Sequence, residues 1–356
     1  MHDPISFQPV FIPKPWGQEI WFTGCEKRGV SLALPYKNSS EAVPLFYFFD
    51  AFQSLLLKNY PLVLVKILDP LDVEVYGDLY FEMHEQKNEV YIVTQTKSPN
   101  PSIRIGIHPE ISLQYENNKE TLQKDILESI ENYEIVRRKI DAIFDEKRIE
   151  NKIPLNDPIS NELLQWWSSE LPVDLRNEEI QKRKHMESFT YYLPLNVSDV
   201  VQVPTFTPHA LQHGVQVVEF QTPTYERAIL SFAQKVLTQK EWNTKEALQK
   251  MRFDPFQQKK LEIKFQNDFV LEEWICQFSD FCAYRVTLSS QQNYFFSKEN
   301  PYHLIYTLNK DLHFLKNSLE VPMKSQECFF IPKEFQHFLV NNSSEACVFL
   351  VIFPKN

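Results

Sequence analysis

The stretch that decides the fold is Glu82-Met83-His84-Glu85-Gln86-Lys87-Asn88-Glu89-Val90-Tyr91-Ile92-Val93. Alternate residues of a β-strand point to the same face, so Glu82 and His84 share a face if a strand ends there. Glu89 opens an apolar run that is typical of a second strand. A turn at residues 86–88 would fold the two strands into a hairpin. The stretch therefore predicts three convergent metal ligands, although a solvated, charged hairpin fits the same residues.

A fourth ligand is expected from a distant stretch, Val203-Pro204-Thr205-Phe206-Thr207-Pro208-His209-Ala210-Leu211-Gln212-His213. It offers two histidines, His209 and His213. Two imidazoles and two carboxylates form a mixed site that suits zinc, with iron or manganese as alternatives. We therefore predict one divalent ion per chain, by preference Zn²⁺, bound by Glu82, His84, Glu89 and a histidine of this stretch.

The two stretches resemble the two motifs of the cupin superfamily. Glu-x-His-x4-Glu is similar to the first, usually His-x-His-x3–4-Glu, and Pro204-x4-His209-x3-His213 is similar to the second, usually Pro-x-Gly-x2-His-x3-Asn. Among cupins, the chain most resembles the type I mannose-6-phosphate isomerases, whose zinc site combines Gln-x-His, Lys-x-Glu and a late Thr-Pro-His. The positions that match this family are Glu82, His84, Lys87, Glu89 and His209, together with Arg227 after the last ligand strand and the opening Pro15-Trp16-Gly17.

The resemblance covers roughly residues 8–110 and 190–232, and the chain departs from it at several positions. The first ligand is Glu82 where the family has Gln. Phe206 stands where the second motif usually has Gly, and His213 stands where it usually has Asn. An Asp that usually precedes the Arg is replaced within residues 222–226. These departures bear on the substrate more than on the fold.

Length and composition fit two domains and exclude some partners. The 356 residues are long for a single core, and 43% hydrophobic residues suffice for buried sheets. A net charge of −10 argues against nucleic acid or an anionic membrane as the main partner.

The five cysteines form no Cys-x-x-Cys pair and are expected to be reduced. Without a visible targeting segment or apolar span, the expected location is the cytoplasm.

The periodicity of the chain predicts a mainly β fold with a helical insertion. Strands are expected within residues 7–34, 61–68, 103–107, 189–193, 200–203 and 215–221, and a short helix at residues 51–57. Residues 116–150 carry apolar residues at helical spacing, and residues 161–168 and 174–187 continue as helices. The insertion spans about residues 111–187, and a linking helix is expected at residues 240–251.

The C-terminal part is expected to form a second cupin barrel without a metal. Residues 331–341 repeat the Pro-x4-His-x3-Asn pattern, but no His-x-His…Glu set accompanies it near residues 303–308. His337 is therefore interpreted as structural. The predicted organisation is a catalytic cupin domain at 1–232 with the helical insertion, then the linking helix and a metal-free cupin-like domain at 233–356. Each barrel is a double-stranded β-helix, or jelly roll.

The resemblance implies an enzyme, specifically a metal-dependent aldose–ketose isomerase of a small phosphorylated sugar, like the one that interconverts mannose 6-phosphate and fructose 6-phosphate through an enediol(ate). It implies that Lys87 adds positive charge beside the metal-bound oxygen, and that Arg227 stabilises the same charge or holds the phosphate. An iron cupin dioxygenase and a non-catalytic sugar-binding cupin remain open. The proton-transferring base, the identity of the sugar and the oligomeric state also remain open.

The carboxylate at position 82 generates a testable prediction. Zinc with two carboxylates and two neutral imidazoles is formally neutral, whereas the family's set with one amide is a stronger Lewis acid. We expect Glu82→Gln to retain its metal and not to lower isomerase activity. Elemental analysis of the purified variant, next to an activity assay, checks this, and complete loss of the metal would refute it.

Overall fold

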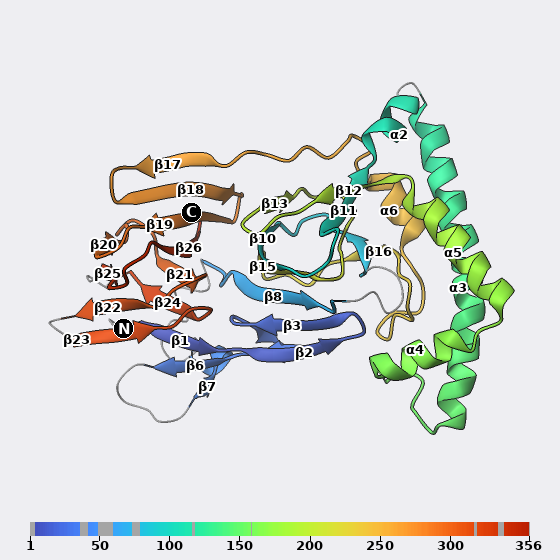
Figure 1. The fold of residues 1–356 in the computed structure, drawn as a ribbon, viewed down its shortest axis with the longest axis horizontal. Helices are drawn as coiled ribbons and strands as arrows, with labels where there is room; N and C mark the ends of the chain where they lie inside the picture. Colours follow the sequence, from blue (N-terminus) through green and yellow to red (C-terminus); the bar gives the residue numbers. More distant parts are fainter. Residues whose placement is uncertain are drawn as a thin grey trace.

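The computed structural model describes residues 4–35, 42–48, 60–72, 79–115, 118–157, 159–316, 319–333 and 338–355. Its sheets lie face to face in four layers, and a group of helices covers one end (Figure 1). The layers run from a five-stranded sheet through a six-stranded and a nine-stranded sheet to a four-stranded sheet. Each neighbouring pair of sheets encloses an apolar core. The fold is thus mainly β, as predicted.

The first barrel is formed by the six-stranded and the five-stranded sheet. The six-stranded sheet has the order β13 (Val200–Val203), β10 (Glu89–Thr96), β15 (Val215–Gln221), β8 (Leu64–Pro70), β3 (Gly17–Trp21) and β2 (Val10–Lys14). The five-stranded sheet has the order β12 (Thr190–Pro194), β11 (Ser102–Ile107), β14 (His209–Leu211), β9 (Phe81–Met83) and β16 (Ala228–Ser231). All strand pairs described within these two sheets are antiparallel.

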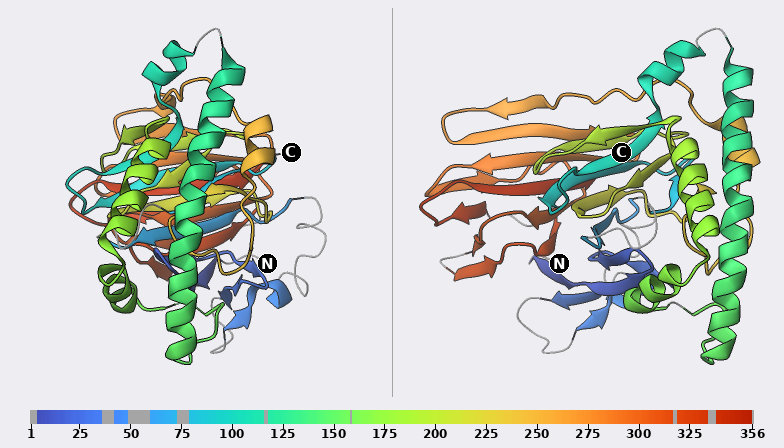
Figure 2. Two further views of the ribbon diagram at one scale, coloured as in Figure 1. Left: turned by 90° about the vertical axis from the view of Figure 1, so that its right-hand side faces the viewer. Right: turned by 45° about the vertical axis from the view of Figure 1, so that its right-hand side comes forward.

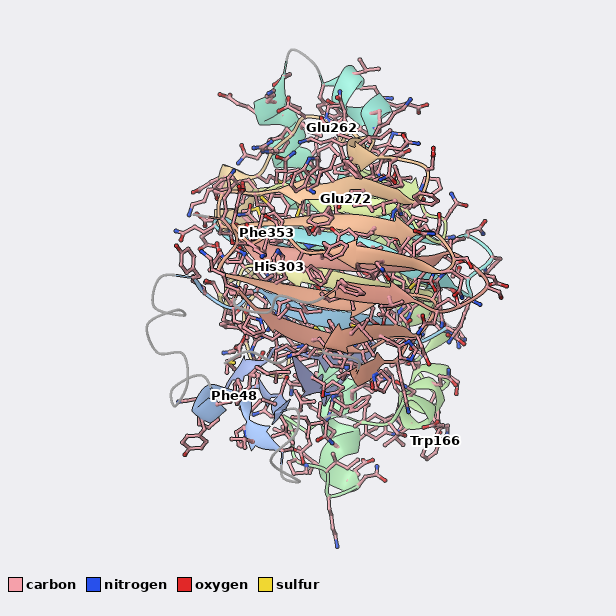
Figure 3. The ribbon with its side chains drawn as sticks, turned by 90° about the vertical axis from the view of Figure 1, so that its left-hand side faces the viewer. Phe48, Trp166, Glu262, Glu272, His303 and Phe353 are labelled. Carbon is pink, nitrogen blue, oxygen red and sulfur yellow. The ribbon has the colours of Figure 1, made fainter. Side chains whose placement is uncertain are left out.

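The second barrel is formed by the nine-stranded and the four-stranded sheet. The nine-stranded sheet has the order β17 (Glu262–Gln266), β18 (Val270–Gln277), β19 (Phe281–Leu288), β26 (Cys347–Pro354), β21 (Tyr302–Thr307), β24 (Cys328–Pro332), β1 (Ile5–Gln8), β6 (Leu32–Pro35) and β7 (Val43–Pro44). The labelled side chains of Figure 3 follow this order, from Glu262 on β17 down to His303 on β21. The four-stranded sheet is β20 (Gln292–Phe295), β25 (Phe338–Asn341), β22 (Leu312–Lys316) and β23 (Leu319–Met323). A small hairpin of β4 (Cys25–Glu26) and β5 (Gly29–Val30) stands apart.

Strand β10 shows why the apolar runs in the sequence are continuous. Successive side chains of a strand point to opposite faces. Val90 and Ile92 lie in the core between the six-stranded and nine-stranded sheets, whereas Tyr91 and Val93 face the interior of the first barrel. Both faces of β10 are therefore buried, and Glu89, two residues before Tyr91, falls on the interior side.

A tight turn joins β2 to β3, with Lys14 opposite Gly17 and Pro15-Trp16 between them. Gly17 has a φ of +147°, and a Cβ at this position would lie 2.3 Å from the carbonyl oxygen of Asp69. Only glycine fits such a backbone position. The turn places Trp16, which is 2% exposed, at one end of the first barrel.

The helical insertion stands across this end of the barrel (Figure 2). It comprises α2 (Pro109–Gln114), α3 (Lys119–Glu150), α4 (Asn161–Ser169) and α5 (Val173–Glu187). The Asn118 side chain accepts a hydrogen bond from the N–H of Thr121 and caps α3. The residues of α3 that face the barrel are buried at helical spacing and include Leu122, Ile126, Ile130 and Tyr133.

Most predicted elements are confirmed, with small differences. Helix α2 was missed because it has no buried residue, so it leaves no apolar periodicity in the sequence. The linking helix is α6 (Thr244–Lys250), which is shorter than the expected 240–251. The expected helix at 51–57 and His337 lie outside the described residues. Among the helices that the structure describes, none has the length and apolar character needed to cross a membrane.

The division at residue 232 stays a prediction. The nine-stranded sheet contains strands from both sides of that boundary, because β1 pairs with β24. Ile5 lies opposite Phe330, and Ser6 lies opposite Phe329. The N-terminal strand is thus part of the sheet of the second barrel.

The fold gives a stability prediction for Asn341 in the second barrel. Its buried amide donates to the carbonyl oxygens of Leu288, Ser289 and Glu345, at 3.1, 3.0 and 2.8 Å. Replacement by alanine leaves these groups without their partner, and we expect Asn341→Ala to lower the free energy of unfolding by about 2–3 kcal/mol. Urea denaturation measures the change, with the exposed neighbour Asn342→Ala as the control. Equal stability of the two variants would contradict this role.

Candidate metal centre and its pocket

Three predicted ligands meet inside the first barrel. The ligand atoms of His84, Glu89 and His209 lie within 4.8 Å of one another, and each of these residues is 2% exposed. Nε2 of His209 lies 3.1 Å from Oε2 of Glu89, and Nε2 of His84 lies 3.3 Å from the same oxygen. Residues far apart in the sequence thus form one compact nitrogen and oxygen cluster.

Strand pairing explains how the cluster forms. His209 begins β14 and lies opposite Glu82 of β9 in the five-stranded sheet. Glu89 begins β10 of the six-stranded sheet, opposite Val203 and Gln221. The turn between β9 and β10 therefore crosses from one wall of the barrel to the other, and it carries His84 and Lys87 inward.

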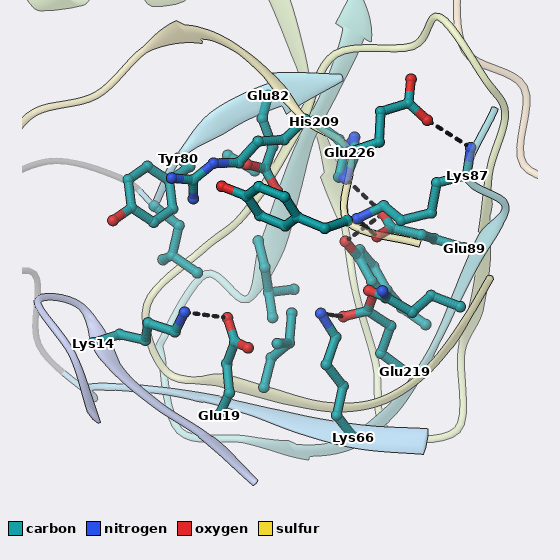
Figure 4. Close-up of a pocket in the computed structure, with 18 of the residues that line it drawn as sticks. Lys14, Glu19, Lys66, Tyr80, Glu82, Lys87, Glu89, His209, Glu219 and Glu226 are labelled. Carbon is teal, nitrogen blue, oxygen red and sulfur yellow. Dashed lines mark hydrogen bonds and ion pairs between the residues drawn. The ribbon is translucent and has the colours of Figure 1, made fainter. Parts of the chain in front are cut away.

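Glu82 lies at the edge of the cluster. Its Oε1 is 3.8 Å from Nε2 of His84, and its side chain is 21% exposed. Glu82 does not belong to the group of three ligand atoms within 4.8 Å of one another. Its side chain lines the pocket above the cluster (Figure 4). Its role as a metal ligand stays a prediction.

The ring nitrogens of the two histidines are placed to bind a cation. Nδ1 of His209 lies 3.1 Å from the carbonyl oxygen of Thr207, which can only accept, so this nitrogen carries the proton. Nε2 of the same ring faces the Glu89 carboxylate. Burial lowers the pKa of His84, and Glu89 opposes this effect. Among the described residues, neither nitrogen of His84 has a hydrogen-bond partner.

A zinc ion would accept these ring nitrogens as ligands. Tetrahedral zinc with nitrogen or oxygen ligands at about 2.0–2.1 Å places neighbouring ligand atoms about 3.3 Å apart. The separations of 3.1 and 3.3 Å from Glu89 to the two imidazoles match this spacing. The donor set, two imidazoles and a carboxylate with a second carboxylate close by, therefore fits a divalent zinc ion.

Glu89 is held as a carboxylate by its neighbours. Burial would raise its pKa, but His84 and Lys87 outweigh burial and hold the pKa well below its usual range. Nζ of Lys87 lies 2.5 Å from Oε1 of Glu89, and Oε2 faces the two imidazoles. One oxygen therefore binds the lysine while the other remains directed at the cluster.

Glu226 fixes the turn that carries Lys87, and sequence reasoning missed this role. Its carboxylate accepts hydrogen bonds from the backbone N–H groups of Glu85, Gln86 and Lys87, at 2.6, 3.0 and 3.1 Å. Successive N–H groups that point to one anion form a strong local contact. Glu226, just before β16, thereby determines the position of a turn that lies about 140 residues earlier in the chain.

The backbone at Phe206 explains why the second motif usually has glycine there. Phe206 has a φ of +63°, in the left-handed region that bulky residues rarely adopt. Its N–H donates to the carbonyl oxygen of His84 at 2.7 Å, and its carbonyl accepts from the N–H of Arg252 at 2.8 Å. The chain thus keeps a glycine-like conformation with a phenylalanine, and this conformation ties the His209 loop to His84.

A pocket opens beside the cluster (Figure 4). Two ion pairs lie on the side of the pocket opposite His209: Lys66 to Glu219 at 3.1 Å and Lys14 to Glu19 at 3.2 Å. Burial would raise the pKa of Glu19, but Lys66 and Lys14 lower it to about 2. Sequence reasoning assigned no role to these four residues. The sequence feature that could have identified them is the presence of Lys66 and Glu219 within otherwise apolar strand sequences.

Both predicted catalytic residues line this pocket. Lys87 is 7% exposed, and Arg227 precedes β16 at the opposite wall. The guanidinium of Arg227 lies 4.8 Å from the centre of the Tyr80 ring, and one of its terminal nitrogens donates to Oγ1 of Thr238 at 2.9 Å. His213 instead points away from the cluster, with Nδ1 at 3.3 Å from the carbonyl oxygen of Leu71. Lys87 and Arg227 thus line the same pocket, and their catalytic roles stay predictions.

Removal of the Glu226 carboxylate should weaken metal binding without touching a ligand. The three N–H groups of the turn would lose their common acceptor, and the orientation of His84 and Glu89 would loosen. We expect Glu226→Ala to bind Zn²⁺ about tenfold more weakly. A titration against a competing chelator measures the affinity, with the exposed Glu241→Ala as the control. Unchanged affinity in Glu226→Ala would show that the turn holds its position without this carboxylate.

Comparison with solved structures identifies proteins that share this fold. No protein-family model and no curated protein sequence match the chain. A mannose 6-phosphate isomerase from Bacillus subtilis matches with a TM-score of 0.66 at 13% identity, over 99% of each chain. A zinc-bound mannose 6-phosphate isomerase matches with a TM-score of 0.63 at 12% identity, over 99% of this chain and 100% of the other.

A third structure agrees with these two. A putative mannosephosphate isomerase from Archaeoglobus fulgidus matches with a TM-score of 0.60 at 11% identity, over 100% of this chain and 99% of the other. The matches run through both barrels and the helical insertion, because they cover nearly the whole chain. The chain therefore has the fold of the mannose 6-phosphate isomerases, as the sequence motifs led us to expect.

Proposed function

We propose that the protein is a metal-dependent isomerase that interconverts the aldose and ketose forms of a phosphorylated sugar. The reaction resembles the conversion of mannose 6-phosphate to fructose 6-phosphate. One observation carries the proposal: a buried His84–Glu89–His209 cluster lies beside a pocket that Lys87 and Arg227 line. The shared fold with mannose 6-phosphate isomerases supports it.

The proposed ligands of one Zn²⁺ are Glu82, His84, Glu89 and His209. When bound, the ion supplies Lewis-acid polarisation of the sugar's carbonyl and neighbouring hydroxyl oxygen. Glu89 and the two imidazoles provide the tight part of the site, and the more exposed Glu82 completes it. The burial of the three inner ligands keeps water away from the reacting carbons.

The two cations have separate proposed roles. Lys87 is held beside Glu89 and carries a fixed positive charge next to the position of the sugar oxygen that becomes negative in the enediolate. Arg227 lies farther along the wall, over Tyr80, and its planar guanidinium suits two oxygens of a phosphate group. We propose that Arg227 holds the phosphate and thereby sets the distance of the reacting carbons from the metal.

The first test combines metal analysis with an assay. The purified, untagged protein is expected to contain about one zinc per chain. Chelator treatment should abolish the conversion of mannose 6-phosphate to fructose 6-phosphate, and added Zn²⁺ should restore it. Stoichiometric iron would favour an iron dioxygenase. No metal after incubation with zinc would favour the sugar-binding cupin and refute the proposal.

Substitution of Lys87 tests the catalytic assignment separately from metal binding. We expect Lys87→Met to lower kcat about 100-fold while the zinc content stays near one per chain, because the charge beside the developing oxyanion is lost. Lys245→Met, an exposed lysine on α6, is the matched control. Full activity in Lys87→Met would refute its catalytic role, and loss of zinc would assign Lys87 to metal binding.

A further inference from the structure

The second barrel is hydrogen-bonded to the turn that carries the proposed ligands and the proposed catalytic lysine. Among the residues that the structure describes, no candidate ligand cluster falls within the second barrel itself. Its turn between β18 and β19 lies on the side that faces the first barrel (Figure 1). This turn contains Asp280, whose half-buried carboxylate contacts Asn88 just before β10. The proposed isomerase reaction assigns no role to this contact.

Both oxygens of Asp280 accept hydrogen bonds from the first barrel. Oδ1 accepts from Nδ2 of Asn88 at 2.8 Å, and Oδ2 accepts from Oγ1 of Thr222 at 2.6 Å. Hydrogen bonds to an ionised acceptor are shorter and stronger than those between neutral groups. One carboxylate of the second barrel thereby joins the segment before β10 to the segment after β15.

The hydroxyl of Thr222 extends this contact to the backbone of the turn. A hydroxyl group has one hydrogen, and here Oγ1 donates it to Asp280. Its lone pairs remain free to accept, and one accepts from the N–H of Asn88 at 3.0 Å. The carbonyl oxygen of Asn88 accepts from the N–H of Thr222, also at 3.0 Å. Asn88 is thus fixed through its side chain, its N–H group and its carbonyl group.

Asn88 lies between two residues of the proposed site. Its chain neighbours are Lys87 and Glu89, and Nζ of Lys87 lies 2.5 Å from Oε1 of Glu89. Glu226 accepts from the three N–H groups that precede the N–H of Asn88. The N–H groups of four successive residues are therefore bound, three by Glu226 and the fourth by Thr222. The first barrel holds this turn through Glu226, and the second barrel holds it through Asp280.

The position of Asp280 is itself determined by the core of the second barrel. Its carbonyl oxygen accepts from the N–H of Lys355 at 2.9 Å. The N–H of Phe278 donates to the carbonyl oxygen of Phe281 at 2.9 Å and closes the turn. Phe281 is fully buried and lies opposite Pro354 of β26. The carboxylate is therefore presented from a turn whose backbone is held on both sides, which suits it to position another segment.

We propose that Asp280 is a positioning residue for the metal centre. From the second barrel it holds the turn at residues 85–89, so that Lys87 and Glu89 keep their mutual position. Its effect on catalysis rests on the proposed isomerase function, whereas its effect on the order of the turn does not. The second barrel thereby takes part in the site without supplying a ligand.

Hydrogen exchange of the full-length protein is the first test. Asp280→Ala removes both acceptors, and we expect the N–H groups of residues 85–88 to exchange about tenfold faster than in the parent protein, because the turn opens more often. Mass spectrometry of peptides that cover the turn measures the rates, with and without Zn²⁺.

Arg285→Met is the matched control for this measurement. It removes another contact between the barrels, in which Nη1 of Arg285 donates to the carbonyl oxygen of Ser198 at 2.9 Å. Exchange in the turn at residues 85–88 should stay at the parent rate in this variant. The proposal is overturned if Asp280→Ala also exchanges at the parent rate, or if both variants accelerate exchange alike.

Zinc affinity and kinetics test the consequence for the site. We expect Asp280→Ala to bind Zn²⁺ about tenfold more weakly in competition with a chelator, and to lower kcat about tenfold. KM should stay within about twofold, because Asp280 itself does not line the pocket. Equal losses in Arg285→Met would mean that Asp280 only joins the barrels. If the parent protein neither binds zinc nor isomerises a sugar, the proposed function fails, and hydrogen exchange still decides on Asp280.

A double-mutant cycle tests the route through Asn88. Asn88→Ala and Asp280→Ala break the same hydrogen bond, so the double variant should accelerate exchange by less than the product of the two single effects. A full product would show that Asp280 acts by another route and would overturn the proposal. Asp280→Asn keeps one acceptor oxygen and should fall between Asp280→Ala and the parent protein. If Asp280→Ala fails to fold, Asp280→Asn decides.

Discussion

The site depends on one buried carboxylate, that of Glu89, which begins a strand covered on both faces. A lone carboxylate in such a place would take up a proton. Here Lys87 binds one oxygen, and the other faces the imidazoles of His84 and His209. Neighbouring groups hold these side chains in position. Glu226 holds the turn of Lys87, and the Thr207 carbonyl sets the tautomer of His209.

Other charged side chains inside the first barrel are also paired with side chains of opposite charge. Lys66 pairs with Glu219. Burial alone would lower the pKa of Lys66, but Glu219 and Glu19 outweigh burial and raise this pKa. Buried ion pairs contribute little net stability, because desolvation offsets their attraction. They do set the position of each polar group in the pocket. The apolar cores on both sides of the six-stranded sheet supply the stability that such a polar interior lacks.

Sequence reasoning succeeded where the signal was local and periodic. The stripe from Leu122 to Tyr133 predicted α3, and the spacing of Glu82, His84 and Glu89 located the turn between two strands. It failed where the signal lay in contacts between distant segments. Nothing near Glu226 indicates that its carboxylate caps the turn at residues 85–87. Helix α2 buries no side chain, and the pairing of β1 with β24 joins strands that local patterns cannot connect.

The pairing of β1 with β24 has a consequence for how the chain is made. The two strands lie more than 300 residues apart, so the nine-stranded sheet cannot be completed until β24 has left the ribosome. Until then β1 presents an unpaired edge, and part of the core against the six-stranded sheet stays open. Contacts of such long range form slowly. An N-terminal segment without β24 therefore leaves this edge open, and open strand edges favour association between chains.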